Sequence, residues 1–403
     1  MGCIDNIFFV IYNNLMKGVN NLKAIINGKI ITEEKVLDNI ILLYSDKILG
    51  FIDSKTTGEL LQNCEEVVDA KGNYVSPGFI DMHIHGSGGY DIMDGTQESL
   101  AAISSIVAKN GVTGILATTM TMSREKVYTA LDNIKNFMGK EEQGAKILGV
   151  HLEGPFINKK YKGAQPEEFI IKPDFGFIHK YVDIIKVITL APEMDVDFKF
   201  IKEVKENSNI ILSIGHSNAE YDQVMKAIEN GISHATHTFN AMTPLNHRNP
   251  GAVGAILVSD IYCELIADKI HVHPAIFRIL ATLKGMDKLI LITDSMRAGC
   301  LHDGISELGG QKVIIKNGTA RLEDNTLAGS TLRLNQAIKN FMDYNGNEIY
   351  QAVKLASLNP AKELNIEKDR GSLEAGKYSD IAIFDKELRI QQTIVEGKTV
   401  YRI

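Results

Sequence analysis

Residues 77–365 alternate short β-rich apolar runs with amphipathic helical segments, and this alternation restricts the possible folds more than any other feature. It predicts eight strands, at Tyr74–His83, Thr113–Thr119, Ile147–Leu152, Ile184–Leu190, Ile210–Ile214, His234–Thr238, Tyr262–Ala267 and Leu289–Thr293. Helices are expected at Gln97–Asn110, Ala219–Asn230 and Pro274–Lys284. Eight strands that alternate with helices pair in parallel and close into a (β/α)8 barrel of the TIM type, an α/β fold. An open doubly wound sheet fits less well, because no glycine-rich dinucleotide motif follows the first strand.

The two ends of the chain have another pattern, of short strands separated by turns such as Asn27-Gly28 and Gly397. We therefore predict a small β-sandwich domain formed from residues 20–76 and 366–403, next to a barrel domain of residues 77–365. Length supports this division, since 403 residues exceed what one barrel needs.

Two further segments interrupt this scheme. Residues 307–323 alternate like a hairpin, with its turn at Asn317-Gly318, and we expect an insertion at the C-terminal mouth of the barrel. It could cap a site there or lie at the periphery. Residues 1–19 are expected to form a disordered extension.

Composition excludes several classes of protein. The net charge is −7 and no long basic run is present, so nucleic acid is not an expected partner. The four cysteines are scattered without a CxxC pair, which favours a reducing cytoplasm over a disulfide framework. The apolar run at residues 7–11 is too short for a signal sequence or a membrane span, so no membrane association is expected.

Polar residues that can bind metals gather where the predicted strands end. They are His83 and His85 after strand one, His151 and Glu153 after strand three, His216 after strand five, His237 at strand six, His271 after strand seven and Asp294 after strand eight. In a barrel, all these strand ends meet at one mouth. The sequence therefore predicts a metal site there.

The residue types limit the metal. Imidazole with carboxylate suits zinc, iron, cobalt or manganese rather than calcium or magnesium. Glu153, His216 and His237 would hold a divalent ion and leave one position open, as catalytic sites do. His83 and His85 share one face of a strand and could hold a second ion bridged through Glu153. They could instead contact substrate or support the first ion, so one or two metals per subunit are expected.

Motifs along residues 20–403 resemble a known family. VSPGFIDMHIHG and GSLEAGKYSDIAIFD are similar to the opening and closing segments of the amidohydrolase superfamily. HLEGPFINKKYKGAQ, IGHS, HATHTFNAMTPLNHRNPG, ADKIHVH, LITDSMRAG and LAGSTL resemble the N-acetylglucosamine-6-phosphate deacetylases within it. HLEGP is the most specific of these motifs, because many relatives use a carboxylated lysine where this chain has Glu153.

The resemblance implies a reaction. Metal-activated water would hydrolyse the N-acetyl group of N-acetyl-D-glucosamine 6-phosphate to D-glucosamine 6-phosphate and acetate, in amino-sugar catabolism. Asp294 would act as general base and then general acid, although an aspartate there could also be a helix N-cap. His271 would polarise the acetamide carbonyl or hold a sugar hydroxyl.

The resemblance also implies a set of residues that bind the sugar phosphate. They are Ala164, Gln165, Asn240, Ala241, Arg248, Asp268, His271, Leu327, Ala328 and Gly329. Asn240 and Ala241 would offer backbone N–H groups at a helix start to an oxyanion. Arg248 would reach the phosphate from the neighbouring subunit of a homodimer.

Two other functions stay open on the sequence. A different amidohydrolase could use the same ligands on an N-acyl amino acid, a dipeptide or a nucleobase, and only the phosphate-binding residues argue against it. A non-catalytic barrel scaffold is also conceivable. It would be expected to have lost ligands, yet Glu153, His216, His237 and Asp294 are all present.

Overall fold

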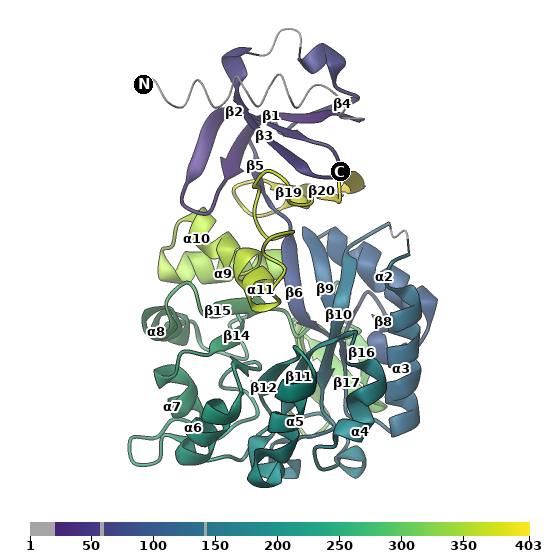
Figure 1. The fold of residues 1–403 in the computed structure, drawn as a ribbon, viewed down its shortest axis with the longest axis vertical. Helices are drawn as coiled ribbons and strands as arrows, with labels where there is room; N and C mark the ends of the chain where they lie inside the picture. The colour runs from purple at the N-terminus through teal and green to yellow at the C-terminus, as the bar shows by residue number, and fades with distance from the viewer. Residues whose placement is uncertain (1–20, 57–59, 141–142) are drawn as a thin grey trace.

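The computed structural model describes residues 21–56, 60–140 and 143–403, and its largest part is a barrel of parallel strands (Figure 1). Around the barrel the strands are β6 (Phe79–Ile84), β9 (Val112–Thr119), β10 (Lys146–Glu153), β11 (Ile185–Leu190), β12 (Ile211–Ile214), β13 (His234–Ala235), β14 (Tyr262–Ile266) and β15 (Leu289–Ile292). A parallel bridge between Ile84 and Ser295 joins the two ends of this sheet. The predicted eight-stranded α/β barrel is confirmed.

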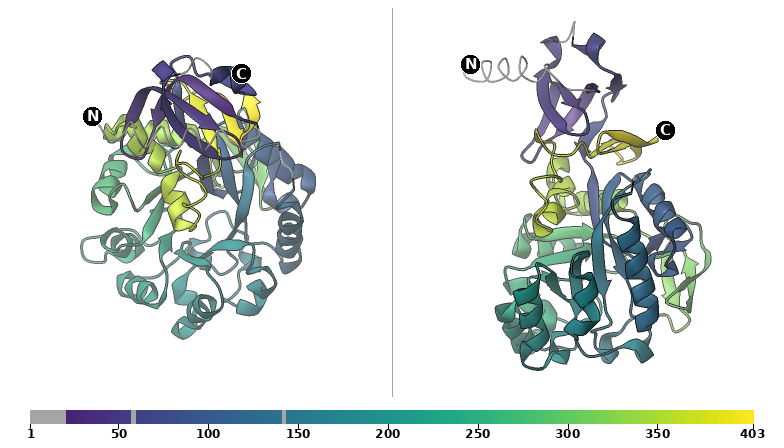
Figure 2. Two further views of the ribbon diagram at one scale, coloured as in Figure 1. Left: turned by 45° about the horizontal axis from the view of Figure 1, so that its top comes forward. Right: turned by 45° about the vertical axis from the view of Figure 1, so that its right-hand side comes forward.

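Helices cover the outside of the barrel and form a ring around its strands (Figure 2). They are α2 (Gln97–Ala108), α3 (Arg124–Phe137), α4 (Phe175–Ile178), α5 (Lys199–Asn207), α6 (Tyr221–Asn230), α7 (Gly251–Val258), α8 (Pro274–Lys284), α9 (Leu334–Asn345), α10 (Ile349–Lys354) and α11 (Leu358–Glu363). Side chains cap several of them, as at α2, where Thr96 accepts the backbone N–H of Ser99. The apolar faces of these helices pack on the buried strands.

Two predicted strands differ from those observed. The strand expected at Tyr74–His83 is divided at Gly78 into β5 (Tyr74–Pro77), which belongs to the terminal sheet, and β6, which belongs to the barrel. A side chain on Gly78 would come within 2.2 Å of Thr113, so glycine permits this crossing. The strand expected at His234–Thr238 pairs only over His234–Ala235. His237 consequently lies in the following turn.

Both chain ends contribute to one sheet above the barrel (Figure 1). Its strands are β1 (Lys23–Ile31), β2 (Val36–Tyr44), β3 (Ile48–Asp53), β4 (Glu66–Asp69), β5, β19 (Ile381–Phe384), β20 (Ile390–Val395) and β21 (Lys398–Arg402). Hydrogen bonds join them into one continuous sheet rather than two separate ones, with its own apolar cluster. A small β unit built from both ends is thereby confirmed. The boundaries given above for the two domains stay predictions, and residues 1–19 lie outside the described residues.

The insertion after β15 is larger than the predicted hairpin at 307–323. It is a three-stranded antiparallel sheet of β16 (Gly304–Leu308), β17 (Gln311–Lys316) and β18 (Thr319–Leu322). The turn at Asn317-Gly318 joins β17 to β18, as expected. The amide of Gln311 donates to the carbonyl of Ala164 at 2.5 Å, which ties the insertion to the barrel mouth.

Among the described residues, no helix combines the length and the apolar character needed to cross a bilayer.

Candidate active site

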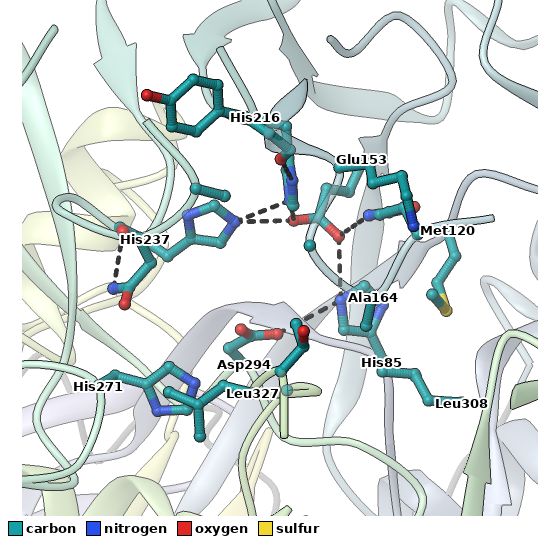
Figure 3. A pocket seen from close by; sticks show the side chains of 18 of the residues that line it. His85, Met120, Glu153, Ala164, His216, His237, His271, Asp294, Leu308 and Leu327 are labelled. Atoms are coloured by element: carbon teal, nitrogen blue, oxygen red, sulfur yellow. Dashed lines mark hydrogen bonds and ion pairs between the residues drawn. The ribbon is translucent and has the colours of Figure 1, made fainter. Parts of the chain in front are cut away.

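Glu153, His216 and His237 form a buried cluster at the barrel mouth (Figure 3). Glu153 ends β10, His216 follows β12, and His237 follows β13. Oε1 of Glu153 lies 3.1 Å from Nε2 of His216 and 3.1 Å from Nε2 of His237. The two Nε2 atoms are themselves 3.1 Å apart. These three predicted ligands therefore converge on one point.

The donor set of this cluster fits a divalent cation. Nδ1 of His216 lies 2.8 Å from the carbonyl oxygen of Tyr161, and a proton donated there leaves the Nε2 lone pair directed at the cluster. Nitrogen and oxygen ligands about 2.0–2.2 Å from a tetrahedral zinc ion are separated by about 3.3 Å. The observed separations of 3.1 Å are close to this value.

His83, His85 and Asp294 form a second group of possible ligands. His85 and Asp294 lie beside Glu153 in Figure 3. Nε2 of His85 lies 3.2 Å from Oε2 of Glu153 and 3.4 Å from Oδ1 of Asp294. Nε2 of His83 lies 3.6 Å from the same Asp294 oxygen. Glu153 therefore belongs to the first group and also contacts the second. The two groups could bind one cation, or two cations that share Glu153 as a ligand.

A backbone hydrogen bond fixes the position of Asp294, which does not cap a helix. It has a left-handed backbone with φ 47°, and its N–H donates to the carbonyl of His83 at 2.9 Å. No helix begins near it, since the next one, α9, starts at Leu334. The helix-cap interpretation of Asp294 is wrong, and the side chain is left to face the pocket.

Burial and opposite charges act against each other in this cluster. Burial alone would lower the pKa of His83, but the carboxylates of Glu264, Glu153 and Asp294 raise it to about 9. Burial would raise the pKa of Glu153, yet the charge of His83 and hydrogen bonds from His216, His237 and His85 hold it well below its usual range. Glu153 is therefore ionised at neutral pH. A cation competes with protons for the imidazoles, so its binding releases protons.

The clusters open into a cavity of about 640 Å³ (Figure 3). Predicted site residues on its walls are His85, Glu153, Ala164, Gln165, His216, His237, Asn240, Ala241, His271, Asp294, Leu327 and Gly329. The volume is in the range of pockets that hold a small ligand. Residues at or after the ends of seven barrel strands, all except β11, and residues of the insertion are thus brought to one space.

Other predicted residues lie outside this wall. His83 is fully buried behind the pocket, and Ala328 is buried between its pocket-lining neighbours. Asp268 supports His271, whose Nδ1 lies 2.7 Å from Oδ2 of the aspartate. Arg248 lies in an exposed loop and does not reach the pocket of its own chain.

Two predicted local roles change in the structure. The segment of Asn240 and Ala241 is not a helix start, because residues 236–241 form turns and α7 begins only at Gly251. The backbone N–H of Asn240 already donates to the carbonyl of His237 at 2.9 Å. Gln165 donates its amide to Oε2 of Glu153 at 2.7 Å, so it orients a candidate ligand as well as lining the pocket.

The sequence reasoning missed several basic residues at the pocket. Lys159, Lys160 and Lys162 line one side, and Arg321 from β18 lines another. The three lysines stand in the stretch KKYK, a short basic cluster in an acidic chain, and this signal was available. Arg321 carried no such signal, because only the fold of the insertion brings it to the barrel mouth. These side chains give the pocket a partly cationic rim.

Glu264 was also missed. It is fully buried in β14 and lies 3.0 Å from Nδ1 of His83. A lone carboxylate within the apolar strand Tyr262–Ile266 was the available signal, because a buried charge needs a partner.

Comparison with known proteins identifies the family of this chain. The model of the amidohydrolase family matches residues 74–400, which is most of the chain. The chain belongs to the amidohydrolase family. This amidohydrolase is 38% identical over 380 residues to N-acetylglucosamine-6-phosphate deacetylase of Bacillus subtilis (strain 168), with 92% of this chain and 95% of that protein covered.

Solved structures agree with this amidohydrolase over nearly the whole chain. N-acetylglucosamine-6-phosphate deacetylase from Pasteurella multocida superposes with a TM-score of 0.89 at 31% identity, covering 94% of this chain and 99% of that one. A mutant of the Mycobacterium smegmatis enzyme in complex with N-acetyl-D-glucosamine-6-phosphate has a TM-score of 0.85 at 28% identity, covering 95% and 100%.

Proposed function

We propose that this amidohydrolase removes the N-acetyl group of N-acetyl-D-glucosamine 6-phosphate, yielding D-glucosamine 6-phosphate and acetate in amino-sugar catabolism. The convergence of Glu153, His216 and His237 beside Asp294, in a small-ligand pocket with a cationic rim, carries this proposal. Similarity to deacetylases that act on this substrate supports it.

Glu153, His216 and His237 would hold the first divalent cation, and His83 and His85 would complete a second position. Their nitrogen and carboxylate atoms suit zinc, iron, cobalt or manganese. When bound, such a cation makes water a nucleophile at neutral pH and polarises the carbonyl oxygen of the substrate.

Asp294 would move the proton. Its carboxylate lies 3.4 Å from Nε2 of His85 and 3.6 Å from Nε2 of His83. Burial would raise its pKa, but these histidines hold it below the usual range. It accepts a proton as the water oxygen bonds to the acetamide carbon. It then donates that proton to the nitrogen as the C–N bond breaks, which leaves acetate and an amine.

His271 would orient the acetamide group. It lines the pocket, and Asp268 fixes its ring by accepting from Nδ1 and from the backbone N–H. Although burial opposes protonation, Asp268 raises the pKa of His271, and in the doubly protonated ring Nε2 would donate to the carbonyl oxygen or a sugar hydroxyl. Ala164, Gln165, Leu327, Ala328 and Gly329 would shape the sugar-binding wall around it.

Arg248 would bind the phosphate of a neighbouring subunit in a homodimer. It lies in the exposed loop 244–250, where Leu245 has 56% of its surface exposed, as an interface residue would before assembly. Its planar guanidinium suits a phosphate, and Asn240 and Ala241 would contact the same end of the substrate. We place the enzyme in the cytoplasm, where phosphorylated sugars are metabolised.

The decisive assay compares acetate release from N-acetylglucosamine 6-phosphate, N-acetylglucosamine, N-acetyl amino acids and dipeptides, with and without a chelator. We expect hydrolysis of the phosphorylated sugar to be favoured and to need a metal. Equal rates on the two sugars would refute the phosphate site, and preference for an amino acid or dipeptide would favour a different amidohydrolase reaction. Activity that survives full metal removal would refute the mechanism.

A further inference from the structure

Glu264 is a fully buried carboxylate that the reaction above does not use. Its side chain extends from β14 into the barrel interior and contacts His83, His234 and His237. It does not line the pocket, so it cannot touch substrate. Burying a carboxylate is costly unless partners compensate, and the partners therefore indicate its role.

One oxygen of Glu264 holds two candidate cation ligands. Oε2 lies 3.0 Å from Nδ1 of His83 and accepts the backbone N–H of His237 at 2.9 Å. Because a carboxylate accepts only, Nδ1 of His83 is the donor, and a neutral His83 keeps its lone pair on Nε2. That Nε2 lies 3.5 Å from Glu153 and 3.6 Å from Asp294, and it has no hydrogen-bond partner among the described residues.

The second hydrogen bond fixes an unusual backbone. His237 has φ 30°, a positive value that side chains other than glycine rarely adopt. This conformation directs its Nε2 to within 3.1 Å of Oε1 of Glu153. In this conformation the backbone N–H of His237 donates to Glu264, and this hydrogen bond stabilises the unusual backbone.

The other oxygen of Glu264 faces a second pair of buried side chains, His234 and Glu363. Its Oε1 lies 3.3 Å from Nε2 of His234, and Nδ1 of His234 lies 3.2 Å from Glu363. All three side chains are buried. Rotation of the carboxylate would leave Nδ1 of His83 and the backbone N–H of His237 without the acceptor that they share.

Glu264 could instead be a ligand itself, since it forms a possible metal-binding group with His83 and His151. The histidine contacts argue against this. Nδ1 of His151 lies 3.1 Å from the carbonyl of Met82, and its Nε2 lies 2.7 Å from the hydroxyl of Thr189. Both ring nitrogens are already hydrogen-bonded, and the nearest nitrogen of His83 is used by Glu264.

We infer that Glu264 is a positioning residue that orients His83 and His237 toward a divalent cation. The inference rests on the cation site of the proposed function. Because outer groups of this kind tune metal affinity, removing the charge of Glu264 should weaken cation binding about tenfold or more.

The test titrates metal-free wild type, Glu264→Gln and Glu363→Gln with Zn²⁺ in competition with a chromophoric chelator. Both variants replace a buried carboxylate in the same network, so the thermal midpoint of each variant, compared with that of wild type, measures how far the substitution destabilises the fold. Glu264→Gln should bind Zn²⁺ at least tenfold more weakly, and Glu363→Gln within twofold of wild type. Wild-type affinity in Glu264→Gln, or equal weakening in the two variants, would overturn the inference.

A second measurement needs no folded variant of Glu264. Nitrogen NMR of wild type with labelled histidines, loaded with Zn²⁺, should show the His83 ring proton on Nδ1, and a ring protonated only on Nε2 would overturn the inference. Failure of wild type to bind Zn²⁺ would instead refute the proposed function. If wild type binds Zn²⁺ and needs it for activity, but Glu264→Gln binds Zn²⁺ with wild-type affinity, only the positioning role is refuted.

Discussion

The Nε2 atoms of His216 and His237 lie 3.1 Å apart, although they come from the ends of different strands. Both also face Oε1 of Glu153 at 3.1 Å. Two imidazole nitrogens at this distance repel each other if both carry a proton, and their lone pairs repel each other if neither does. A divalent cation satisfies all three atoms, which explains why a buried site keeps them together.

Metal removal should reduce both stability and activity. A cation that binds the folded chain stabilises it by about 4 kcal/mol at a thousandfold excess over its dissociation constant. Treatment with a chelator should therefore lower the thermal midpoint by several degrees and abolish acetate release. Zn²⁺, Co²⁺ or Mn²⁺ should restore both, and Mg²⁺ should not, because it prefers oxygen ligands. An unchanged midpoint after verified metal removal would contradict this prediction.

Asp294→Asn should bind cations but turn over slowly. The amide cannot accept the proton from water, and general acid–base catalysis contributes about 10²–10⁴-fold. We expect kcat to fall by that factor, with metal content measured by elemental analysis unchanged. Asp303→Asn is a matched control, because Asp303 is exposed and binds the backbone N–H groups of Asn317 and Gly318. Normal turnover in Asp294→Asn would exclude it as the proton carrier.

Arg248→Ala should lower kcat/KM for the phosphorylated sugar by about 10–100-fold, the value of a hydrogen bond to a charged group. Turnover of unphosphorylated N-acetylglucosamine should not change. Arg389→Ala, at an exposed arginine near the terminal sheet, is the control.

Mixed dimers test whether Arg248 acts across a subunit interface. Neither Arg248→Ala nor Asp294→Asn alone should be fully active. In the proposed homodimer, a subunit with an intact Asp294 would receive Arg248 from a partner that carries Asp294→Asn, so activity of the mixed dimer should recover. No recovery on subunit exchange would place Arg248 in its own chain's site or outside any site.

His234 should make stability depend on pH. Burial opposes its protonation, but Glu264 and Glu363 raise its pKa to about 9. The folded state thus binds this proton more tightly than the unfolded chain, whose histidine titrates near 6.5. The contribution, roughly 3 kcal/mol, is complete below pH 6.5 and is lost as the pH rises through 9.

Denaturant unfolding of metal-free wild type and His234→Gln between pH 6 and pH 10 measures this contribution. Wild type should lose more unfolding free energy with rising pH than His234→Gln. His302→Gln, which changes an exposed histidine, should behave like wild type. Parallel pH curves for wild type and His234→Gln would contradict the prediction.

The sequence determined the barrel and which polar residues gather at its mouth. Strand and helix periods are local properties, and parallel pairing follows from their alternation, so the residues after each strand were assigned to one mouth. Glu153, His216, His237 and Asp294 were assigned to this mouth in this way, and all four line the pocket there. The terminal β unit was found by the same local patterns.

Tertiary structure alone decided the contacts between distant segments. The third strand of the insertion, the two-residue length of β13 and the approach of Arg321 to the pocket depend on how separate elements pack, which no local period encodes. The same holds for Glu264, which is 181 positions from His83 in sequence yet 3.0 Å away in space. A buried carboxylate is stable only beside its partners, and closure of the barrel is what places those partners next to it.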